Sequence, residues 1–138
     1  MPLQLTIVTP EGVRFEGAVQ RVVVPGAEGD FGVLPGHERF LSPVKIGELD
    51  LEEPGGKRSF AAVSEGFAEV TTDKVVLMVD AAEFAADIDT ARAQRAKANA
   101  ERQIEQAEIS HAEDASYRLA EGALQRAVIR IQVAAKGR

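Results

Sequence analysis

The chain has 138 residues, of which 45% are hydrophobic, and a formal net charge of −6 at pH 7. Its length predicts one domain, or one compact domain with an appendage. It contains no cysteine, which excludes disulfides and thiolate metal sites and is typical of a reducing compartment. No apolar run approaches the roughly 20 residues that span a bilayer, and the N-terminus lacks a signal-peptide pattern, so we expect no direct membrane insertion.

The charge is distributed unevenly along the chain. Residues 1–84 contain 14 acidic and 7 basic residues, whereas residues 85–138 contain 8 and 9. Nucleic acids and anionic lipids are bound through Lys and Arg, so the acidic first part disfavours both as partners. We expect no nucleic acid to bind, and a neutral or basic protein surface to be the partner.

Residues 1–84 have the pattern of short strands separated by turns. All six prolines, all six phenylalanines and ten of the twelve glycines lie there. Residues 75–79 are fully apolar and predict a strand buried on both faces. About nine or ten strands indicate an all-β sandwich or flattened barrel. The other strands are predicted at residues 3–7, 18–24, 41–46, 47–52, 60–63 and 67–71, with turns at 53–57 and 72–74.

One segment, residues 22–37, combines an apolar strand with four glycines and two prolines. Glycine adopts positive φ at low cost and proline fixes φ, so this composition predicts tight turns on both sides of a very short strand at residues 31–34. Polar side chains at Glu28, Asp30 and His37 would then lie at the rim of a rigid loop, where binding residues are often found.

Residues 85–138 have the pattern of two helices. They contain fifteen alanines and no proline. The first helix is predicted over residues 88–106, with Asp87 or Asp89 as its cap, and the second over residues 112–134 after a turn at 108–111. The predicted fold class is therefore an all-β N-terminal sandwich of about ten strands followed by a C-terminal antiparallel αα hairpin. The domains would be residues 1–84 and 85–138.

The apolar face expected for the first helix consists almost entirely of alanine, with isoleucine only towards its ends. An alanine methyl contributes far less burial energy than a leucine, at roughly 0.8 kcal/mol per CH₂, so the hairpin has only a modest reason to stay docked. Alanines also permit close and permanent helix packing, and both readings stay open here. The expected faces are Ile88, Ala91, Ala96, Ala100, Ile104 and Ala107, and then Leu119, Ala123, Leu124, Ala127, Val128 and Ile131.

The chain lacks the motifs of common enzymes and phosphate sites. The glycines at positions 26, 29 and 32 do not form GxGxxG, and Gly56-Lys57 lacks the upstream glycine of a P-loop. With only His37 and His111, a metal site or a catalytic triad has little material, so we expect no catalytic residue, no metal and no enzymatic activity. His37 is interpreted as a structural or interface residue.

Two pairs of charged residues share helical faces. Asp89 and Arg92 are three apart, and Arg126 and Arg130 are four apart, so the folded hairpin could present them to one anion. The alternative is an ordinary surface ion pair at Asp89 and Arg92 and a solvated face on the second helix.

Four segments follow one another along the chain in a recognisable order: Val24–His37, Ile46–Leu49, Glu65–Val70 and Asp87–Ala93. In this order they resemble the epsilon subunit of the bacterial F-type ATP synthase, and the resemblance covers essentially the whole chain. The sequence departs from many members at Glu38-Arg39-Phe40, where they carry Ala-Pro and an aliphatic residue.

The resemblance implies a non-catalytic rotor subunit of the central stalk. Its β-domain would bind the gamma subunit and the c-ring, with Glu28, Asp30 and His37 at the c-ring contact. Its helices would regulate the complex, inhibiting ATP hydrolysis in an extended state that contacts gamma and the alpha and beta subunits. The protein would be peripheral, at the cytoplasmic face of the bacterial inner membrane, and would require no cofactor.

The resemblance also implies a regulatory ATP site in the folded hairpin, so the alternative function is an ATP-sensing module. The motif Ile88-Asp89-x-x-Arg92-Ala93 is similar to one by which some members bind ATP. Asn99 stands where good binders carry another arginine, which predicts weaker binding. The candidate ATP-binding residues are Glu83, Ile88, Asp89, Arg92, Arg126 and Arg130.

Overall fold

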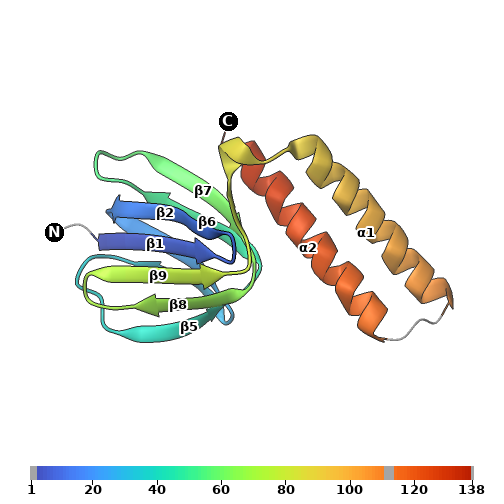
Figure 1. The fold of residues 1–138 in the computed structure, drawn as a ribbon, viewed down its shortest axis with the longest axis horizontal. Helices are drawn as coiled ribbons and strands as arrows, with labels where there is room; N and C mark the ends of the chain where they lie inside the picture. The colour runs from blue at the N-terminus through green and yellow to red at the C-terminus, as the bar shows by residue number, and fades with distance from the viewer. Residues whose placement is uncertain (1–2, 111–113, 138) are drawn as a thin grey trace.

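The computed structural model describes residues 3–110 and 114–137. In these residues an N-terminal β-domain is followed by two long helices packed side by side (Figure 1). The expectation of a β-sandwich followed by an αα hairpin is confirmed. The strands are β1 (Leu3–Thr9), β2 (Gly12–Val19), β3 (Arg21–Gly26), β4 (Gly29–Val33), β5 (Phe40–Val44), β6 (Gly47–Glu52), β7 (Arg58–Val63), β8 (Gly66–Val70), β9 (Lys74–Val79) and β10 (Ala82–Phe84). The helices are the 3₁₀ turn η1 (Ala85–Asp87), α1 (Thr90–Ser110) and α2 (Asp114–Lys136).

All ten strands are hydrogen-bonded into one sheet, which folds over on itself as a flattened sandwich. The strand order is β10-β7-β6-β3-β5-β8-β9-β1-β2, and β4 pairs with β3 beside this path. The pairing of β1 with β9 is parallel, whereas the other strand pairs are antiparallel. Strands β1 and β10, the first and last of the chain, therefore lie near opposite ends of the sheet.

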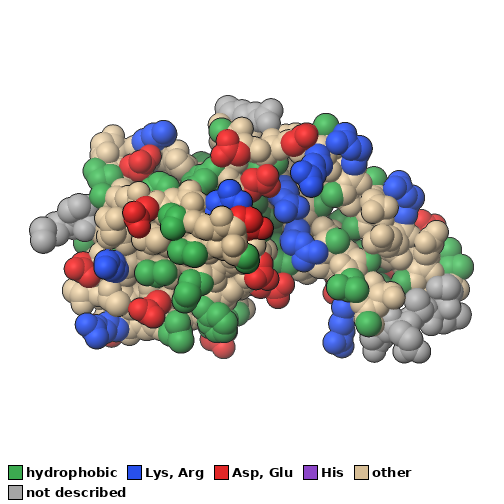
Figure 2. All heavy atoms as spheres, viewed as in Figure 1, with side chains coloured by type: hydrophobic (Ala, Val, Ile, Leu, Met, Phe, Trp, Pro, Cys, Tyr) green, Lys and Arg blue, Asp and Glu red, His purple; other side chains and the backbone are tan. Residues whose placement is uncertain are grey.

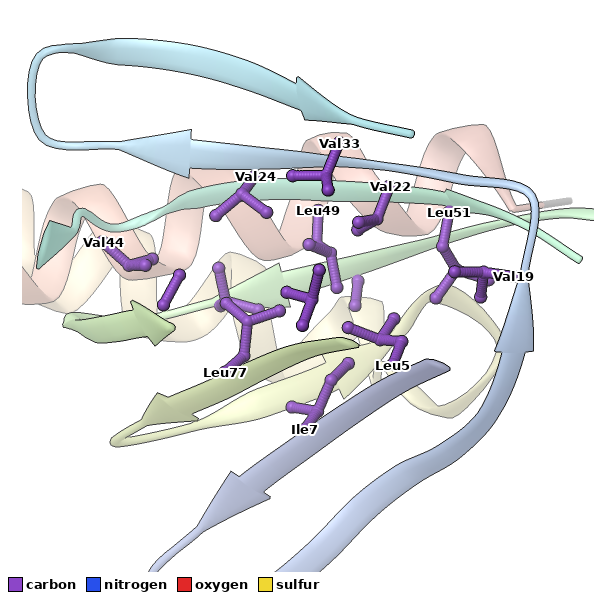
Figure 3. Packing of buried hydrophobic residues seen from close by; sticks show 14 of the residues in the cluster. Leu5, Ile7, Val19, Val22, Val24, Val33, Val44, Leu49, Leu51 and Leu77 are labelled. Carbon is purple, nitrogen blue, oxygen red and sulfur yellow. The ribbon is translucent and has the colours of Figure 1, made fainter. Parts of the chain in front are cut away.

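The core fills the space between the two layers with aliphatic side chains (Figure 3). Strand β1 alternates strictly, so that Leu3, Leu5 and Ile7 are fully buried while the residues between them are half-exposed. Leu49 and Leu51 of β6 enter the same core from the other layer. This period of two is what places one face of each strand inside.

Two strand predictions were wrong. The segment predicted as one strand at residues 18–24 is divided at Gln20 between β2 and β3. Strand β2, at the edge of the sheet, was missed: four of its eight residues are exposed, and apolar and polar residues alternate only over residues 13–16. Strand β9 is buried on one face only, since Met78 is 47% exposed on the other. No described helix covers that outer face.

The glycine-rich segment forms the β3–β4 hairpin, whose turn is Ala27–Glu28. Gly29, with φ +133°, adopts a backbone conformation that other residues avoid. Gly26 has a different role, because a Cβ there would lie 2.7 Å from the carbonyl oxygen of Gly29. The strand predicted at residues 31–34 is β4, which begins two residues earlier and ends at Val33.

Helix α1 begins where its cap predicts. The Asp89 carboxylate Oδ1 accepts a hydrogen bond from the backbone N–H of Arg92 at 3.0 Å, so Asp89 and not Asp87 is the N-cap. The helix begins at Thr90 and ends at Ser110 instead of spanning residues 88–106. The turn predicted at 108–111 is therefore wrong for residues 108–110, while His111 lies outside the described residues, as do positions 112 and 113.

The helices contact each other through alanines spaced seven residues apart. Ala93, Ala100 and Ala107 are buried on α1, and Ala120 and Ala127 are buried on α2. Such small side chains let two helix backbones approach closely. The prediction of Ala100, Ala107 and Ala127 as buried is confirmed.

Other positions on the predicted helix faces are exposed. Ala91 and Ala96 lie in solvent, and Leu119 is 74% exposed. Leu119 lies in the half of α2 that extends past the sandwich, where α1 is the neighbouring element among the described residues (Figure 1). The spacing of apolar residues could not predict this exposure, because it assumes that another element packs against the helix along its whole length.

The hairpin docks on the sandwich through α2, which lies between the sandwich and α1 (Figure 1). A second apolar cluster joins Val133 and Ala134 of α2 to Ala62 of β7 and to Ala85 and Ile88. Two ion pairs add to it, Arg130 to Glu83 at 3.0 Å and Lys136 to Glu48 at 2.8 Å. The contact is thus confined to the C-terminal half of α2.

Candidate functional sites

A pocket of about 320 Å³ lies where β10, the start of α1 and α2 meet. Five of the six residues predicted to bind ATP line it, contributed by three separate segments of the chain: Glu83, Ile88, Asp89, Arg92 and Arg130. Asp87, Ala93 and Ala96 complete the walls. The Asp89 cap positions the first turn of α1 so that Arg92 lies in the wall.

Arg126 is the one predicted residue that the structure does not bring into this pocket. It lies one turn earlier on α2 and lines a smaller neighbouring space with Ser64, Ala81 and Arg130. Asn99, on α1, does not line the pocket either, and its Oδ1 accepts a hydrogen bond from Arg102 at 3.5 Å.

The charges in the pocket are already partly compensated. The Nε of Arg130 donates to Glu83, and Asp89 accepts from the backbone of Arg92 instead of pairing with its guanidinium. Among the described residues the Arg92 side chain makes no ion pair within 4.0 Å, which leaves it available to an anion. With three acids and two arginines in the walls, a polyphosphate must draw Arg130 away from Glu83 or arrive with a divalent cation. Sequence reasoning missed Asp87, which directly precedes the motif.

The three residues predicted to contact the c-ring do not lie together. Glu28 and Asp30 are exposed at the β3–β4 turn, next to the pairing of Gly26 with Val44. His37 precedes β5 at its other end, and its ring lies 5.2 Å from that of Phe40. The length of a five-residue strand, about 13 Å at 3.3 Å per step, separates the two ends. The segment thus presents two surfaces, an acidic turn and a histidine loop.

The sandwich also has an exposed apolar patch that sequence reasoning missed, formed by Leu41, Phe67 and Met78 on β5, β8 and β9. Phe67 pairs directly with Met78, and the three side chains are 64%, 51% and 47% exposed. Figure 2 shows green side chains gathered on this domain. Patches of this kind mark protein–protein contacts. The fully apolar run at residues 75–79 includes Met78 of this patch, but it was interpreted as a strand buried on both faces.

Other kinds of site find no support in the described part of the chain. Within residues 3–110 and 114–137 there is no group of three or more acidic or histidine residues that could hold a metal ion. The same residues include no helix that is long and apolar enough to cross a membrane.

The fold and these surfaces define a class of protein with a partner-binding β-sandwich and a docked two-helix hairpin. Family models match both parts: the beta-sandwich domain of the ATP synthase Delta/Epsilon chain matches residues 2–85, and its long alpha-helix domain matches residues 86–135. The chain belongs to the ATP synthase delta/epsilon chain family.

Curated relatives and solved structures agree with this assignment. The ATP synthase epsilon chain of Geotalea daltonii is 42% identical over 134 residues, covering 97% of this chain and 94% of the relative. That of Nitratidesulfovibrio vulgaris is 44% identical over 131 residues, covering 95% and 94%. That of Halalkalibacterium halodurans is 39% identical over 134 residues, covering 97% and 98%.

Two solved structures share the fold. A chain in the Euglena gracilis mitochondrial ATP synthase structure of OSCP, F1 and c-ring matches with a TM-score of 0.81 and 25% identity, covering 97% of this chain and 81% of that one. A chain in the Tetrahymena thermophila central stalk and c-ring structure matches in fold, with a TM-score of 0.57 and 13% identity, and 97% of each chain is covered.

Proposed function

We propose that this chain is a non-catalytic rotor subunit of a proton-translocating F-type ATP synthase. It connects gamma to the c-ring and inhibits ATP hydrolysis through its C-terminal helices, at the cytoplasmic face of a bacterial inner membrane. The observation that carries the regulatory part is the small contact between hairpin and sandwich. Its cluster has five buried residues, three of them alanines, with Phe60 and Ile129 partly buried against it, so this contact is much smaller than the core of the sandwich.

A hairpin held in this way can exchange between states at modest cost. The two ion pairs that support it, Arg130–Glu83 and Lys136–Glu48, are between 25% and 53% exposed, and such pairs are typically worth at most about 1 kcal/mol. When the hairpin extends, the alanine faces and Val133 become available to gamma and to the alpha and beta subunits. Inhibition then depends on the fraction of molecules with an extended hairpin.

The two partner surfaces have different chemistry. We assign the acidic turn with Glu28 and Asp30 to the polar loops of the c-ring, because its exposed carboxylates can pair with basic groups. We assign gamma to the patch of Leu41, Phe67 and Met78, whose apolar area suits a lasting protein contact. His37 lies in the loop between Leu34 and Leu41, both exposed, and thus borders the gamma surface.

Reconstitution with gamma, alpha, beta and the c-ring tests this function. The full chain should co-purify with gamma, and deletion of residues from Asp87 onward should leave assembly intact while ATP hydrolysis rises. Failure of the full chain to bind gamma in the reconstituted complex would reject the rotor assignment. Unchanged hydrolysis in the truncated complex would reject only the inhibitory role of the hairpin.

A second candidate function, nucleotide sensing, is favoured by the pocket that gathers Glu83, Asp89, Arg92 and Arg130. Its walls come from β10 and both helices, so bound ATP would stabilise the docked hairpin and oppose inhibition. Isothermal titration of the isolated full chain with Mg-ATP should give saturable heat. The absence of heat at millimolar nucleotide would reject ATP sensing without affecting the rotor assignment.

A further inference from the structure

A second and larger pocket, of about 580 Å³, lies at the other side of the hairpin contact. Its walls come from β2, the β6–β7 turn, β10, η1 and the C-terminal end of α2, and none of its lining residues lines the pocket assigned to ATP. Gly137 closes one wall against Ala85 so tightly that a Cβ at Gly137 would clash with it. The volume is typical of small-molecule sites.

This pocket concentrates positive charge in an acidic protein. Arg14, Lys57 and Arg58 are three of the seven basic residues in residues 1–84, and Lys136 adds a fourth cation from α2. Glu53 is the one acidic residue in the lining. Such a grouping on a chain of net charge −6 favours an anionic occupant.

Three of the four cations are already paired with acidic residues, and Arg14 has the longest of these ion pairs, at 4.0 Å from Glu11. A hydrogen bond and the charge of Asp50 raise the pKa of Arg58 above its ordinary value, so its guanidinium stays charged. Lys136 pairs with Glu48. These two acidic partners, Asp50 and Glu48, do not line the pocket. Lys57 makes no ion pair with a described acidic residue and is exposed in the β6–β7 turn.

Three half-buried aromatic rings supply an apolar surface next to these cations. Phe15 and Phe84 pack against each other with ring centroids 5.9 Å apart. The Phe60 ring lies 5.2 Å from the Arg58 guanidinium carbon and 5.5 Å from the Lys136 Nζ. A purely inorganic anion would contact the cations and not the rings, and a purely apolar molecule would contact the rings and not the cations.

From this combination we propose that the pocket binds a small amphiphilic anion, with its apolar body against Phe15, Phe60 and Phe84 and its acidic group near Lys57 and Arg14. Aromatic anions and acyl anions share this chemistry. Because the walls include both the sandwich and the end of α2, an occupant contacts both parts and favours the docked hairpin. The site shares no lining residue with the pocket assigned to ATP, although Arg14 and Phe84 also line an adjoining pocket with Glu83, Arg92 and Arg130.

Fluorescence titration of the full chain with the aromatic sulfonate 1-anilinonaphthalene-8-sulfonate tests the proposal. We expect saturable binding to one site, with a dissociation constant raised about tenfold by Lys57→Glu, a change equivalent to about 1.4 kcal/mol. Lys74→Glu, an exposed lysine outside the pocket with the same change in charge, is the matched control and should leave binding unchanged. Non-saturable binding, or equal effects of the two substitutions, would overturn the proposal.

A second variant tests the cavity itself. Ala86 is exposed in η1 and lines the pocket, so Ala86→Phe should fill the space and abolish probe binding while the far-ultraviolet circular dichroism stays unchanged. Unaltered binding by this folded variant would place the probe elsewhere and contradict the assignment.

Competition against the bound probe distinguishes the two sources of the anion. Displacement by myristate identifies an acyl anion as the fitting class, and displacement by adenosine monophosphate identifies an aromatic one. Displacement by neither compound would reject an amphiphilic-anion site.

Discussion

At the scale of single residues, polar groups in this chain do more than their charge suggests. Asp89 caps α1, and through the cap it sets the place of Arg92 in the pocket wall. Arg126 and Arg130 share a helical face and a small space beside Ser64, yet only Arg130 also lines the pocket assigned to ATP, because Arg126 lies one turn earlier on α2. The contribution of each residue therefore depends on backbone geometry that its type alone does not reveal.

Replacement of the cap should destabilise the hairpin. Asp89→Ala removes the acceptor of the Arg92 N–H, which should lower the free energy of unfolding by about 1 kcal/mol. Thermal unfolding followed by circular dichroism measures the change. Asp87→Ala, which removes a nearby carboxylate that makes no cap, should have little effect, and an equal loss of stability in both variants would contradict the capping role.

The arginines should differ in their effect on nucleotide binding. Arg92→Ala removes a cation from the pocket wall and should weaken Mg-ATP binding about tenfold or more, since a hydrogen bond to a charged group contributes about 1.5–3 kcal/mol. Arg126→Ala should change the affinity by less than about threefold. Calorimetric titration compares the two variants. Equal losses would show that the pocket rearranges around the ligand.

At the scale of elements, the hairpin is held together by small side chains and close approach. Ala93, Ala100 and Ala107 repeat every seven residues on α1, and Ala120 and Ala127 do so on α2. Because the helices pack closely, a larger side chain does not fit at these positions, even though the alanines bury little apolar area. This spacing fixes which faces of the two helices meet, whereas the attachment to the sandwich depends on the separate cluster around Val133.

An enlarged side chain in the helix contact should open it. Ala100→Leu introduces three carbon atoms at a residue that is 1% exposed, which should cost about 1–3 kcal/mol of stability. Ala91→Leu, at an exposed position on the same helix, is the control and should be close to neutral. Differential scanning calorimetry resolves the two cases. A neutral Ala100→Leu would show that the helices are not closely packed.

At the scale of the whole molecule, two parts of unequal stability are joined by one helix. The sandwich has a continuous aliphatic core, whereas the hairpin contacts it through Val133, Ala134 and a few neighbours. Local opening is expected where few buried apolar contacts hold an element. The hairpin should therefore leave the sandwich without unfolding it.

A charge placed in the small cluster should separate the two parts. Val133 is fully buried, and Val133→Asp puts a carboxylate among Ala62, Ala85 and Ile88, where burial of a charge is costly, so the hairpin should undock. Hydrogen exchange should then accelerate in α1 and α2 while the amides of β1 and β9 stay protected. Gln132→Asp adds the same charge at an exposed neighbouring position and should not change the exchange. Loss of protection throughout the sandwich would show that the two parts unfold together.

Local patterns by themselves predicted the strands with strict alternation and the two long helices, because each depends on residues close in the chain. They left two candidate caps for the first helix, Asp87 and Asp89, and the structure decided for Asp89. The order of motifs along the chain also carried the resemblance to the family. Edge strand β2 was not predicted, because its apolar and polar residues alternate only over residues 13–16, before Gly17.

Tertiary structure alone decided which surfaces face one another. It placed Glu28 and His37 at opposite ends of a strand, left Leu119 in solvent where α2 passes beyond the sandwich, and exposed one face of β9. It also assembled both pockets from segments far apart in sequence. Such outcomes depend on how the layers pack, which minimises exposed apolar area over the whole chain and not within any one segment.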